Sequence, residues 1–339
     1  MAGDAVSDTQ PELTSPEDAG RRGTQPDLST WAEPDPLAPS GLEPEGEDPL
    51  IGQTVAGRYH VDAIIADGGM GRVYMASDEQ HGTVALKTLL PVYSSHTLVV
   101  QRFQREVTSL REAQCPHVVT MHEYGELPDG RAFFVMEFVD GVALDTVLKS
   151  LAHPMDPSRA IKIALQLCAA LIPAHALGIV HRDLKPENLI LCEIGGQQDV
   201  LKVLDFGIAK PLTEAHGITE AGQVLGTPTY MSPEQCTGRA VDERSDIYAL
   251  GVLLYELLAG EPPFVGEKPW DVIRSHLKTP PTPLSERDPA VSVPEALERL
   301  LMRCLLKAPE QRFQTMREVH AEMGAIAAAL GVEPPATAR

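Results

Sequence analysis

Residues 57–139 alternate between apolar and polar side chains in short runs, which are rich in β-branched residues and separated by turns that contain glycine. A period of two residues is typical of β-strands that bury one face. The runs are residues 59–66, 71–77, 83–90, 118–126 and 131–139. The last two flank Asp129-Gly130, a pair that favours a tight hairpin turn. One helical stretch at about 99–112 interrupts the series, so we predict a small β-rich region with a single helix.

After residue 141 the apolar residues recur at helical spacing instead. Residues 158–176 predict a long helix with Ser158 as its N-terminal cap. Pro173 lies in the last turn of this helix and should kink or end it. Residues 246–260 are apolar nearly all round, which is typical of a helix buried in the middle of a domain. The second region is therefore predicted to be mainly helical.

Two short apolar runs, 188–193 and 200–205, interrupt this helical region and predict a pair of strands joined by a turn at 194–199. The predicted fold class is α+β with two lobes. The small β-rich N-lobe occupies about residues 55–139 and the larger helical C-lobe about residues 140–325. A cleft between two such lobes is a usual place for a ligand.

Residues 1–50 differ in composition from the rest of the chain. They contain twelve acidic residues, two arginines and eight prolines, with almost no periodicity. Such a segment cannot bury enough apolar surface to offset the entropy of ordering, so we expect a disordered acidic tail. Thr14, Ser15 and Ser29 are candidate modification sites within it, and Trp31 is a candidate anchor for a partner. A solvated tail without a docking role is the simpler interpretation.

Composition narrows the class of protein. The chain has 339 residues, of which 43% are hydrophobic and 22% charged, as in globular proteins. A formal net charge of −20 disfavours nucleic acid as a partner, because nucleic-acid binding requires a basic surface. No apolar run approaches the roughly 20 residues that span a bilayer, and no apolar signal core begins the chain. Five scattered cysteines without metal-binding spacing fit a reducing compartment, so we expect a cytoplasmic protein without a membrane contact.

Residues 66–73, Ala-Asp-Gly-Gly-Met-Gly-Arg-Val, form a glycine-rich turn between two predicted strands. Backbone N–H groups in such a turn can hold phosphate oxygens. The last two glycines of the phosphate-binding pattern G-x-G-x-x-G-x-V fall on Gly68 and Gly71, and its valine on Val73. Ala66 stands at the first glycine. An ordinary hairpin explains the same residues, so this motif needs support from elsewhere in the chain.

Lys87 ends the alternating run of a strand that lies one hairpin after this turn, where it can hold phosphate oxygens as a point charge. Glu106 lies beside the apolar stripe of the following helix, where a carboxylate turned inward needs a cation such as Lys87. Each residue also has an ordinary surface interpretation. Lys87 can be a solvated strand lysine, and Glu106 can pair with Arg102 or Arg105.

Residues 179–190 place an acid, a cation and an amide in one short loop before an apolar strand. Asp183 can accept a hydroxyl proton, Lys185 can neutralise a transferring phosphoryl group, and Asn188 can ligate Mg²⁺. Asp205, at the end of the next strand, adds a carboxylate of the kind that magnesium prefers. A chance loop seldom offers these functions together, so the segment indicates phosphoryl transfer.

Six motifs follow one another in an order that is similar to that of protein kinases. They are residues 67–73 (DGGMGRV), 84–87 (VALK), Glu106, 181–188 (HRDLKPEN), 205–207 (DFG) and 232–234 (SPE). The chain thus resembles the eukaryotic-like serine/threonine kinases of bacteria, over about residues 55–325, with a short C-terminal tail at 326–339. The resemblance implies the two-lobed protein kinase fold.

The resemblance implies a role for each catalytic candidate. Asp183 would be the catalytic base, and Lys185 would neutralise the γ-phosphate. Lys87 would hold the α- and β-phosphates, with Glu106 fixing its position. The cofactors implied are ATP and Mg²⁺, with Mn²⁺ as a substitute.

The resemblance also implies the remaining ligands and two structural contacts. Asn188 and Asp205 would hold the metal ion. Glu234 and Arg312 would form a buried ion pair, and Asp246 would brace the catalytic loop from the central helix.

The implied nucleotide site combines the glycine-rich turn with residues from the neighbouring strands. It comprises Ile65, Ala66, Asp67, Gly68, Gly69, Met70, Gly71, Val73, Ala85, Lys87, Met136, Glu137, Val139 and Asn188. Met136 would guard the back of the adenine pocket, before a hinge at 137–139. A methyl group at Ala66 restricts the backbone, so we expect a modest loss of nucleotide affinity and not loss of binding.

Regulation by phosphorylation is a further hypothesis. Arg182 precedes the catalytic acid, and kinases of this kind often need a phosphorylated activation loop to satisfy that arginine. The loop at 208–225 offers Thr219 and Thr213, of which we favour Thr219 because it lies nearer the segment GTPTYMSPE. Thr227 is expected to contact the catalytic acid and substrate instead.

The function implied is that of a non-specific serine/threonine protein kinase, which transfers the γ-phosphoryl group of MgATP to protein hydroxyls and autophosphorylates in its activation loop. Protein substrates are the implied partners. An upstream regulator, a partner of the acidic tail and a homodimer for trans-autophosphorylation stay open. A pseudokinase is disfavoured because no catalytic group is missing. A small-molecule kinase is disfavoured because residues 226–234 resemble a platform for protein substrates.

Overall fold

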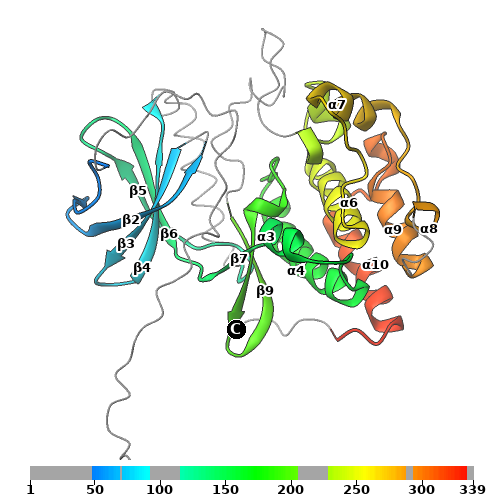
Figure 1. Cartoon of the computed structure of the whole chain (residues 1–339), viewed down its shortest axis with the longest axis horizontal. Helices are drawn as coiled ribbons and strands as arrows, with labels where there is room; N and C mark the ends of the chain where they lie inside the picture. Colours follow the sequence, from blue (N-terminus) through cyan, green and yellow to red (C-terminus); the bar gives the residue numbers. More distant parts are fainter. Residues whose placement is uncertain (1–47, 69–70, 92–114, 205–227, 288–292, 334–339) are drawn as a thin grey trace, which may run out of the picture.

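The computed structural model describes residues 48–68, 71–91, 115–204, 228–287 and 293–333. It has two parts, a six-stranded sheet and a helical region, with a second, three-stranded sheet between them (Figure 1). The predicted two-lobed α+β architecture is therefore confirmed. Residues 326–329, predicted as the start of the C-terminal tail, are helical instead. Residues 1–47, residues 334–339 and the helix predicted at about 99–112 lie outside the described residues. What was predicted for them stays a prediction.

The first sheet is antiparallel, with the strand order β1-β2-β3-β4-β6-β5. Its strands are β1 (Thr54–Val55), β2 (Tyr59–Gly68), β3 (Gly71–Asp78), β4 (Gly82–Leu89), β5 (Met121–Glu126) and β6 (Ala132–Glu137). The predicted turn at Asp129-Gly130 joins β5 to β6, and Gly130 has a φ of 85°, which favours glycine. All five alternating runs of the sequence thus form strands of one sheet.

Alternation along β4 sends neighbouring residues to opposite faces of this sheet. Val84 and Leu86 belong to one apolar cluster, whereas Ala85 belongs to another. Lys87 is two residues from Ala85 and therefore lies on the same face as Ala85. This face is the one that meets residues of the helical region.

The second region holds most of the helices and the small sheet β7-β8-β9. The helices are α3 (Leu144–Ser150), α4 (Pro157–Ala176), α5 (Pro233–Cys236), α6 (Glu243–Ala259), α7 (Pro269–Lys278), α8 (Leu284–Arg287), α9 (Glu295–Cys304) and α10 (Met316–Ala329). The strands are β7 (Gly141–Ala143), β8 (Leu189–Ile194) and β9 (Gln197–Val203), and short 3₁₀ turns are η2 (Pro186–Asn188), η3 (Pro228–Tyr230) and η4 (Pro309–Gln311). The strand pair predicted at 188–193 and 200–205 is confirmed as β8 and β9.

Helix α4 corrects the predicted N-terminal cap and one of the two effects predicted for Pro173. Its N-terminal cap is Asp156 and not Ser158, because the Asp156 carboxylate accepts the backbone N–H of Ser158 at 2.9 Å. Pro157 follows at the first helical position, where its missing N–H costs nothing. Pro173 does not end the helix, which continues to Ala176. The helix ends instead where Gly178 adopts a φ of 73°.

Helix α6 lies in the middle of the helical region, as its apolar sequence predicts. It contacts α4, α9 and α10 (Figure 1). Its side chains are buried on nearly all sides. Gly251 permits the close approach of α9, since a Cβ there would lie 2.8 Å from the Cβ of Cys304. A helix enclosed in this way is a rigid base for whatever it contacts.

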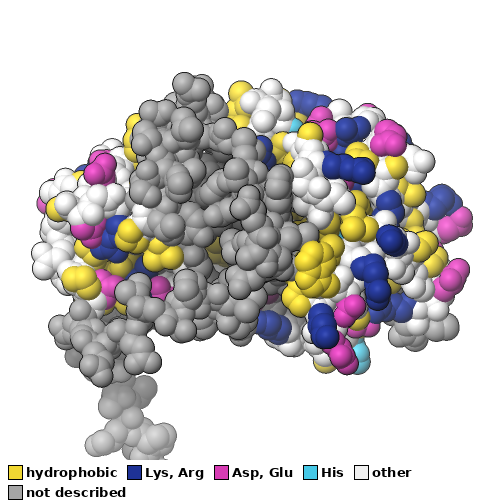
Figure 2. All heavy atoms as spheres, turned by 90° about the horizontal axis from the view of Figure 1, so that it is seen from above, with side chains coloured by type: hydrophobic (Ala, Val, Ile, Leu, Met, Phe, Trp, Pro, Cys, Tyr) yellow, Lys and Arg dark blue, Asp and Glu magenta, His cyan; other side chains and the backbone are white. Residues whose placement is uncertain are grey.

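The surface shown in Figure 2 mixes charges of both signs. Lysine and arginine side chains lie among acidic and apolar ones on the helical region, so the described residues on this face form no extended area of one sign. No helix in the described ranges has the length and hydrophobicity that crossing a bilayer requires.

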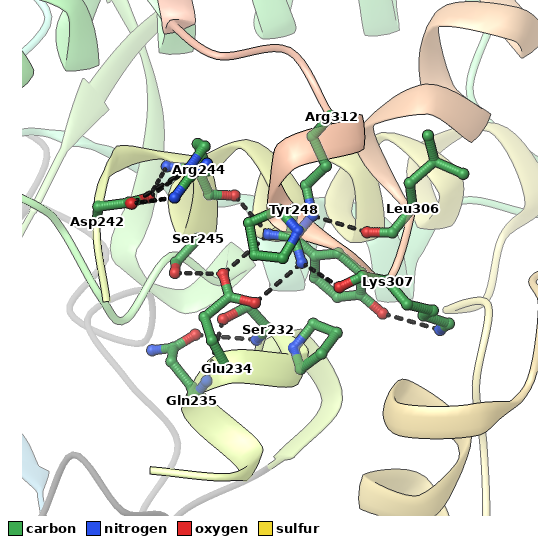
Figure 3. A network of polar contacts seen from close by, with 12 residues as sticks. Ser232, Glu234, Gln235, Asp242, Arg244, Ser245, Tyr248, Leu306, Lys307 and Arg312 are labelled. Carbon is green, nitrogen blue, oxygen red and sulfur yellow. Dashed lines mark hydrogen bonds and ion pairs between the residues drawn. The ribbon is translucent and has the colours of Figure 1, made fainter. Parts of the chain in front are cut away.

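A buried ion pair connects α5 with the segment after α9 (Figure 3). Arg312 is 1% exposed and donates two parallel hydrogen bonds to Glu234, at 2.8 Å and 2.9 Å. The remaining guanidinium donors reach the carbonyl oxygens of Arg244, Leu306 and Lys307. Burial alone raises the pKa of Glu234, but the bonds from Arg312 outweigh it and lower the pKa. The ion pair implied by the resemblance is confirmed, and every charge in it is compensated.

We predict that Arg312→Ala lowers the free energy of unfolding by about 3–5 kcal/mol, because it leaves the Glu234 carboxylate buried without its cation. Urea unfolding followed by circular dichroism measures the change. Arg317→Ala is the matched control, since Arg317 is an exposed arginine on α10 and should change stability by less than about 0.5 kcal/mol. Equal effects of the two substitutions would contradict a structural role of the pair.

Candidate active site

The loop that carries Asp183 is hydrogen-bonded to a carboxylate on α6. Asp246 is 1% exposed and accepts the backbone N–H of His181 at 2.8 Å and of Arg182 at 3.0 Å. The ring of His175 lies 2.8 Å from the same carboxylate. The predicted brace is confirmed, and it ties the loop to the buried helix α6.

Arg182 adopts a left-handed backbone conformation, with a φ of 64°. Such a conformation is strained for a residue other than glycine, by about 1–3 kcal/mol. Two contacts compensate it, because Asp246 accepts the N–H of Arg182 and the side chain of Gln235 donates to its carbonyl oxygen at 2.8 Å. The change of backbone direction at Arg182 sets the direction in which the side chain of Asp183 projects from the loop. Gln235 was missed in the sequence because it lies 53 residues away.

His181 links the loop to the strand that leads to Asp205. Its Nδ1 accepts the backbone N–H of Asp183 at 3.3 Å, so Nε2 carries the proton and donates to the carbonyl oxygen of Leu204 at 3.1 Å. Leu204 directly follows β9, and Asp205, the next residue, lies outside the described residues. The position of Asp183 and the position of the residue before Asp205 are therefore coupled through one buried imidazole.

The structure brings Asp183, Lys185 and Asn188 together. The Lys185 ammonium lies 4.0 Å from the Asp183 carboxylate. The amide nitrogen of Asn188 donates to the carbonyl oxygen of Asp183 at 2.8 Å and to its carboxylate at 3.3 Å. The amide oxygen of Asn188 is consequently the atom left to ligate a cation. These are hard oxygen donors without a thiolate or imidazole, a set that fits Mg²⁺.

Six of the residues predicted to bind nucleotide meet in one apolar cluster. Ile65, Ala66, Ala85, Met136 and Val139 are buried there, and Val73 packs against them. The cluster also contains residues of the helical region: Ile190, Cys192, Val200 and Leu204. Apolar side chains from both lobes therefore adjoin one another beside the catalytic loop.

The glycine-rich turn and Lys87 lie next to this cluster. In the sheet register Val73 is paired with Lys87 and Ala66 with Val73. Asp67 and Gly68 are exposed at the end of β2, and Gly71 begins β3. Seven predicted residues lie outside the described residues: Gly69, Met70, Glu106, Asp205, Thr213, Thr219 and Thr227.

An ion pair that the sequence analysis missed joins the predicted hinge to the second lobe. The Lys202 ammonium on β9 lies 2.6 Å from the Glu137 carboxylate at the end of β6. The other carboxylate oxygen accepts the backbone N–H of Thr120 at 3.0 Å. Lys202 is only 7% exposed, and a lysine inside the apolar run VLKVL was the signal that pointed to a buried partner.

The segment after the activation loop is also hydrogen-bonded to α6. The Tyr230 hydroxyl donates to Glu256 on α6 at 2.5 Å. Burial raises the pKa of Glu256, and the nearby charges of Glu187 and Asp145 raise it further. Tyr230 therefore holds the described part of the predicted substrate platform against α6, near the carboxylates of Glu187 and Asp145.

His276 on α7 fixes the same segment from the other side. Its Nδ1 accepts the hydroxyl of Tyr248 at 2.9 Å, and its Nε2 donates to the carbonyl oxygen of Thr229 at 3.0 Å. Burial, together with the neighbouring Lys307 ammonium, lowers the pKa of His276 to about 4. The imidazole is therefore neutral near pH 7, as its two hydrogen bonds require.

Comparisons with known proteins agree with this geometry. The chain matches the family described as "Protein kinase domain" over residues 59–322. Serine/threonine-protein kinase pkn3 of Myxococcus xanthus is 39% identical over 283 residues, which are 82% of this chain and 52% of that protein. Serine/threonine-protein kinase PknB of Mycobacterium leprae is 37% identical over 270 residues, 78% of this chain and 42% of that protein. The chain thus spans about half the length of these relatives or less.

A solved structure supports the same fold. The crystal structure of the PknI kinase domain of Mycobacterium tuberculosis superposes with a TM-score of 0.63 at 30% sequence identity. The similarity covers 81% of this chain and 98% of that one. It therefore extends over both lobes.

We predict that His276 makes stability depend on pH between about 6.5 and 4. As the pH falls through this window, His276 binds a proton in the unfolded chain but not in the folded chain. The free energy of unfolding therefore decreases, by up to about 3 kcal/mol. Urea unfolding at pH 7, 5.5 and 4.5 measures the slope. His276→Gln should be less stable at pH 7 and show a flatter slope. His153→Gln, at an exposed position, should keep the slope of the parent chain.

Proposed function

The chain belongs to the protein kinase family, and we propose that it is a serine/threonine kinase that transfers the γ-phosphoryl group of MgATP to hydroxyl groups of proteins. The observation that carries the proposal is the loop in which Asp246 and His181 hold Asp183 beside Asn188 and Lys185. The names of the similar proteins agree with this activity. We assign the kinase domain to about residues 55–325, as the motifs indicate.

In the proposed reaction Asp183 orients the substrate hydroxyl and accepts its proton. The substrate oxygen forms a bond to the γ-phosphorus while the bond from this phosphorus to the β,γ-bridging oxygen breaks, which leaves ADP. Lys185 neutralises charge that develops on the transferring group. Asn188 and Asp205 are the residues that would hold magnesium, which neutralises phosphate charge when bound. Mn²⁺ is the expected substitute, because it accepts the same oxygen donors.

The apolar cluster around Met136 is the proposed seat of the adenine ring, since it offers flat apolar contacts from both lobes. Val139 and Glu137 would contribute the polar backbone groups of the hinge. Backbone N–H groups at Gly68 to Gly71 would hold phosphate oxygens, and Lys87, positioned by Glu106, would neutralise them. The Ala66 methyl group lies in the apolar cluster. This placement supports the expectation of a modest effect on affinity.

Two alternative functions are less well supported. A pseudokinase would lack a chemical group, whereas Asp183, Lys185 and Asn188 are present and in contact. A small-molecule kinase would not need a fastened substrate platform, whereas Tyr230 and Thr229 are held by α6 and α7. We propose protein substrates, and we propose autophosphorylation in trans within a transient homodimer.

We predict that Asp183→Asn lowers kcat by about 10²- to 10⁴-fold, because the proton acceptor is lost while the shape is retained. Intact mass spectrometry of the full chain after incubation with MgATP should show mass gains in phosphate steps for the parent only. Asp62→Asn on β2 replaces an exposed aspartate and is the matched control. Absence of a gain in the parent would favour a pseudokinase. Equal gains in the parent and Asp183→Asn would sink the assignment of Asp183.

We predict that Thr219→Ala lowers the rate of substrate phosphorylation several-fold, because Arg182 then lacks the phosphate charge that orders the loop. Thr213→Ala is the matched control in the same loop and should have the smaller effect. Peptide mapping of the autophosphorylated chain identifies the modified residue. A phosphate found on Thr213 and absent from Thr219 would contradict our choice.

A further inference from the structure

The guanidinium of Arg72, directly after Gly71, is held by two carboxylates from different segments. Its Nε and Nη2 donate to Asp67 on β2, at 2.8 Å and 2.5 Å. Its Nη1 donates to Asp48, which precedes β1. Asp67 is the cross-strand partner of Arg72, so that contact is internal to the glycine-rich hairpin. Asp48 connects the hairpin to a segment outside it.

Asp48 occupies a site that satisfies both of its carboxylate oxygens. One oxygen accepts the backbone N–H of Leu50 at 2.9 Å, and the other accepts the hydroxyl of Tyr74 at 3.0 Å as well as the Arg72 guanidinium. Burial alone raises the pKa of Asp48, but the hydrogen bonds from Leu50, Arg72 and Tyr74 outweigh it and lower the pKa. The carboxylate is therefore charged near pH 7.

The two contacts of Arg72 differ in exposure to solvent. The Asp67 side chain is 54% exposed, and solvent screens a pair of this kind to a small net effect. The Asp48 side chain is 5% exposed, so its attraction for Arg72 is screened much less. Asp67 accepts two bonds from Arg72 within the hairpin, and Asp48 is the less screened contact, which holds the arginine from outside the hairpin.

Arg72 in turn belongs to the arm of the hairpin that is seated on β4. A Cβ at Gly71 would lie 1.8 Å from the carbonyl oxygen of Thr88, so the two backbones are in direct contact. The Thr88 hydroxyl donates to the carbonyl oxygen of Arg72 at 3.4 Å. The contacts of the Arg72 side chain therefore bear on the backbone next to Gly71, which lies two residues along β3 from Val73, the partner of Lys87.

We infer that Asp48 is a positioning residue for the nucleotide: through Arg72 it holds the Gly71 arm of the glycine-rich turn in the place where phosphate is bound. The inference rests on the proposed function, because that function assigns the phosphates to this turn. A turn that is ordered in advance loses less entropy when the nucleotide binds, which raises affinity and leaves the chemical step unchanged.

The test compares Asp48→Asn with Asp62→Asn in the full chain. Asp62 is an exposed aspartate on β2 and leaves the contact of Arg72 intact. Isothermal titration with MgATP and steady-state phosphorylation of a peptide give Kd, KM and kcat. For Asp48→Asn we expect Kd and KM for ATP to rise about tenfold, with kcat within about twofold of the parent. Asp62→Asn should match the parent in all three.

A thermodynamic cycle with Arg72→Gln tests whether Asp48 acts through Arg72. If it does, the double variant binds MgATP no more weakly than Arg72→Gln alone, within about twofold. Effects that multiply in the double variant would overturn the inference. Tyr74→Phe, which removes only a hydroxyl bond to Asp48, is the milder variant and should raise Kd about two- to threefold.

Thermal unfolding separates a positioning role from a purely structural one. A lower Tm of Asp48→Asn with Kd for ATP within twofold of the parent would overturn the inference and leave the proposed function intact. A parent chain that binds no MgATP would overturn both. A rise in Kd without a matching loss in kcat supports the inference.

Discussion

The contact of Asp246 with the backbone of His181 and Arg182 is the constraint on which the candidate active site depends. Helix α6, which carries Asp246, is enclosed by α4, α9 and α10, so the carboxylate is a fixed point within the core. The strained backbone of Arg182 persists because its N–H and its carbonyl oxygen are both bonded. The packing of the helical region therefore determines the position of Asp183, and the loop itself does not.

Other polar contacts, made by α6 and its neighbours in the helical region, position the segment that follows the activation loop. Glu256 and His276 hold Tyr230 and Thr229, and a short way on Glu234 is paired with Arg312. Burial of apolar surface drives the helices together but has no direction, so it cannot by itself set the position of a turn. Buried hydrogen bonds are directional, and a misplaced partner costs the desolvation of an unsatisfied group. The polar contacts therefore select one arrangement among several that would bury similar apolar area.

The two lobes meet through an apolar cluster and an ion pair. The cluster combines Ala85 and Met136 of the first sheet with Ile190 and Leu204 of the second region. Lys202 binds Glu137 at the point where the chain leaves the first sheet. A flat apolar ligand on this cluster would contact both lobes, while phosphates attached to it would reach the glycine-rich turn. The proposed role of Asp48 extends the same logic, because a buried charge fixes an element that contacts the ligand.

Local pattern alone determined a large part of this protein. Alternating side chains predicted the strands of the first sheet, an apolar sequence predicted the burial of α6, and the residues 181–188 predicted the grouping of Asp183 with Asn188. The resemblance to kinases added the Glu234–Arg312 pair and the brace at Asp246. These features depend on neighbours a few residues away or on motifs with a fixed order. Periodicity and turn chemistry act over that range.

Tertiary structure decided the features whose partners are distant in sequence. The cap of α4 was predicted at Ser158 but is Asp156. Both residue types can cap a helix, and only the path of the folded chain selects one of them. His276 and Thr229 are 47 residues apart, and Asp48 and Arg72 are 24 apart, so no local signal marks either contact. A histidine or an aspartate in isolation fits the surface as well as the interior. The folded chain determines which of these side chains are buried away from water. A buried polar side chain needs a hydrogen-bond partner, because burial without one costs free energy.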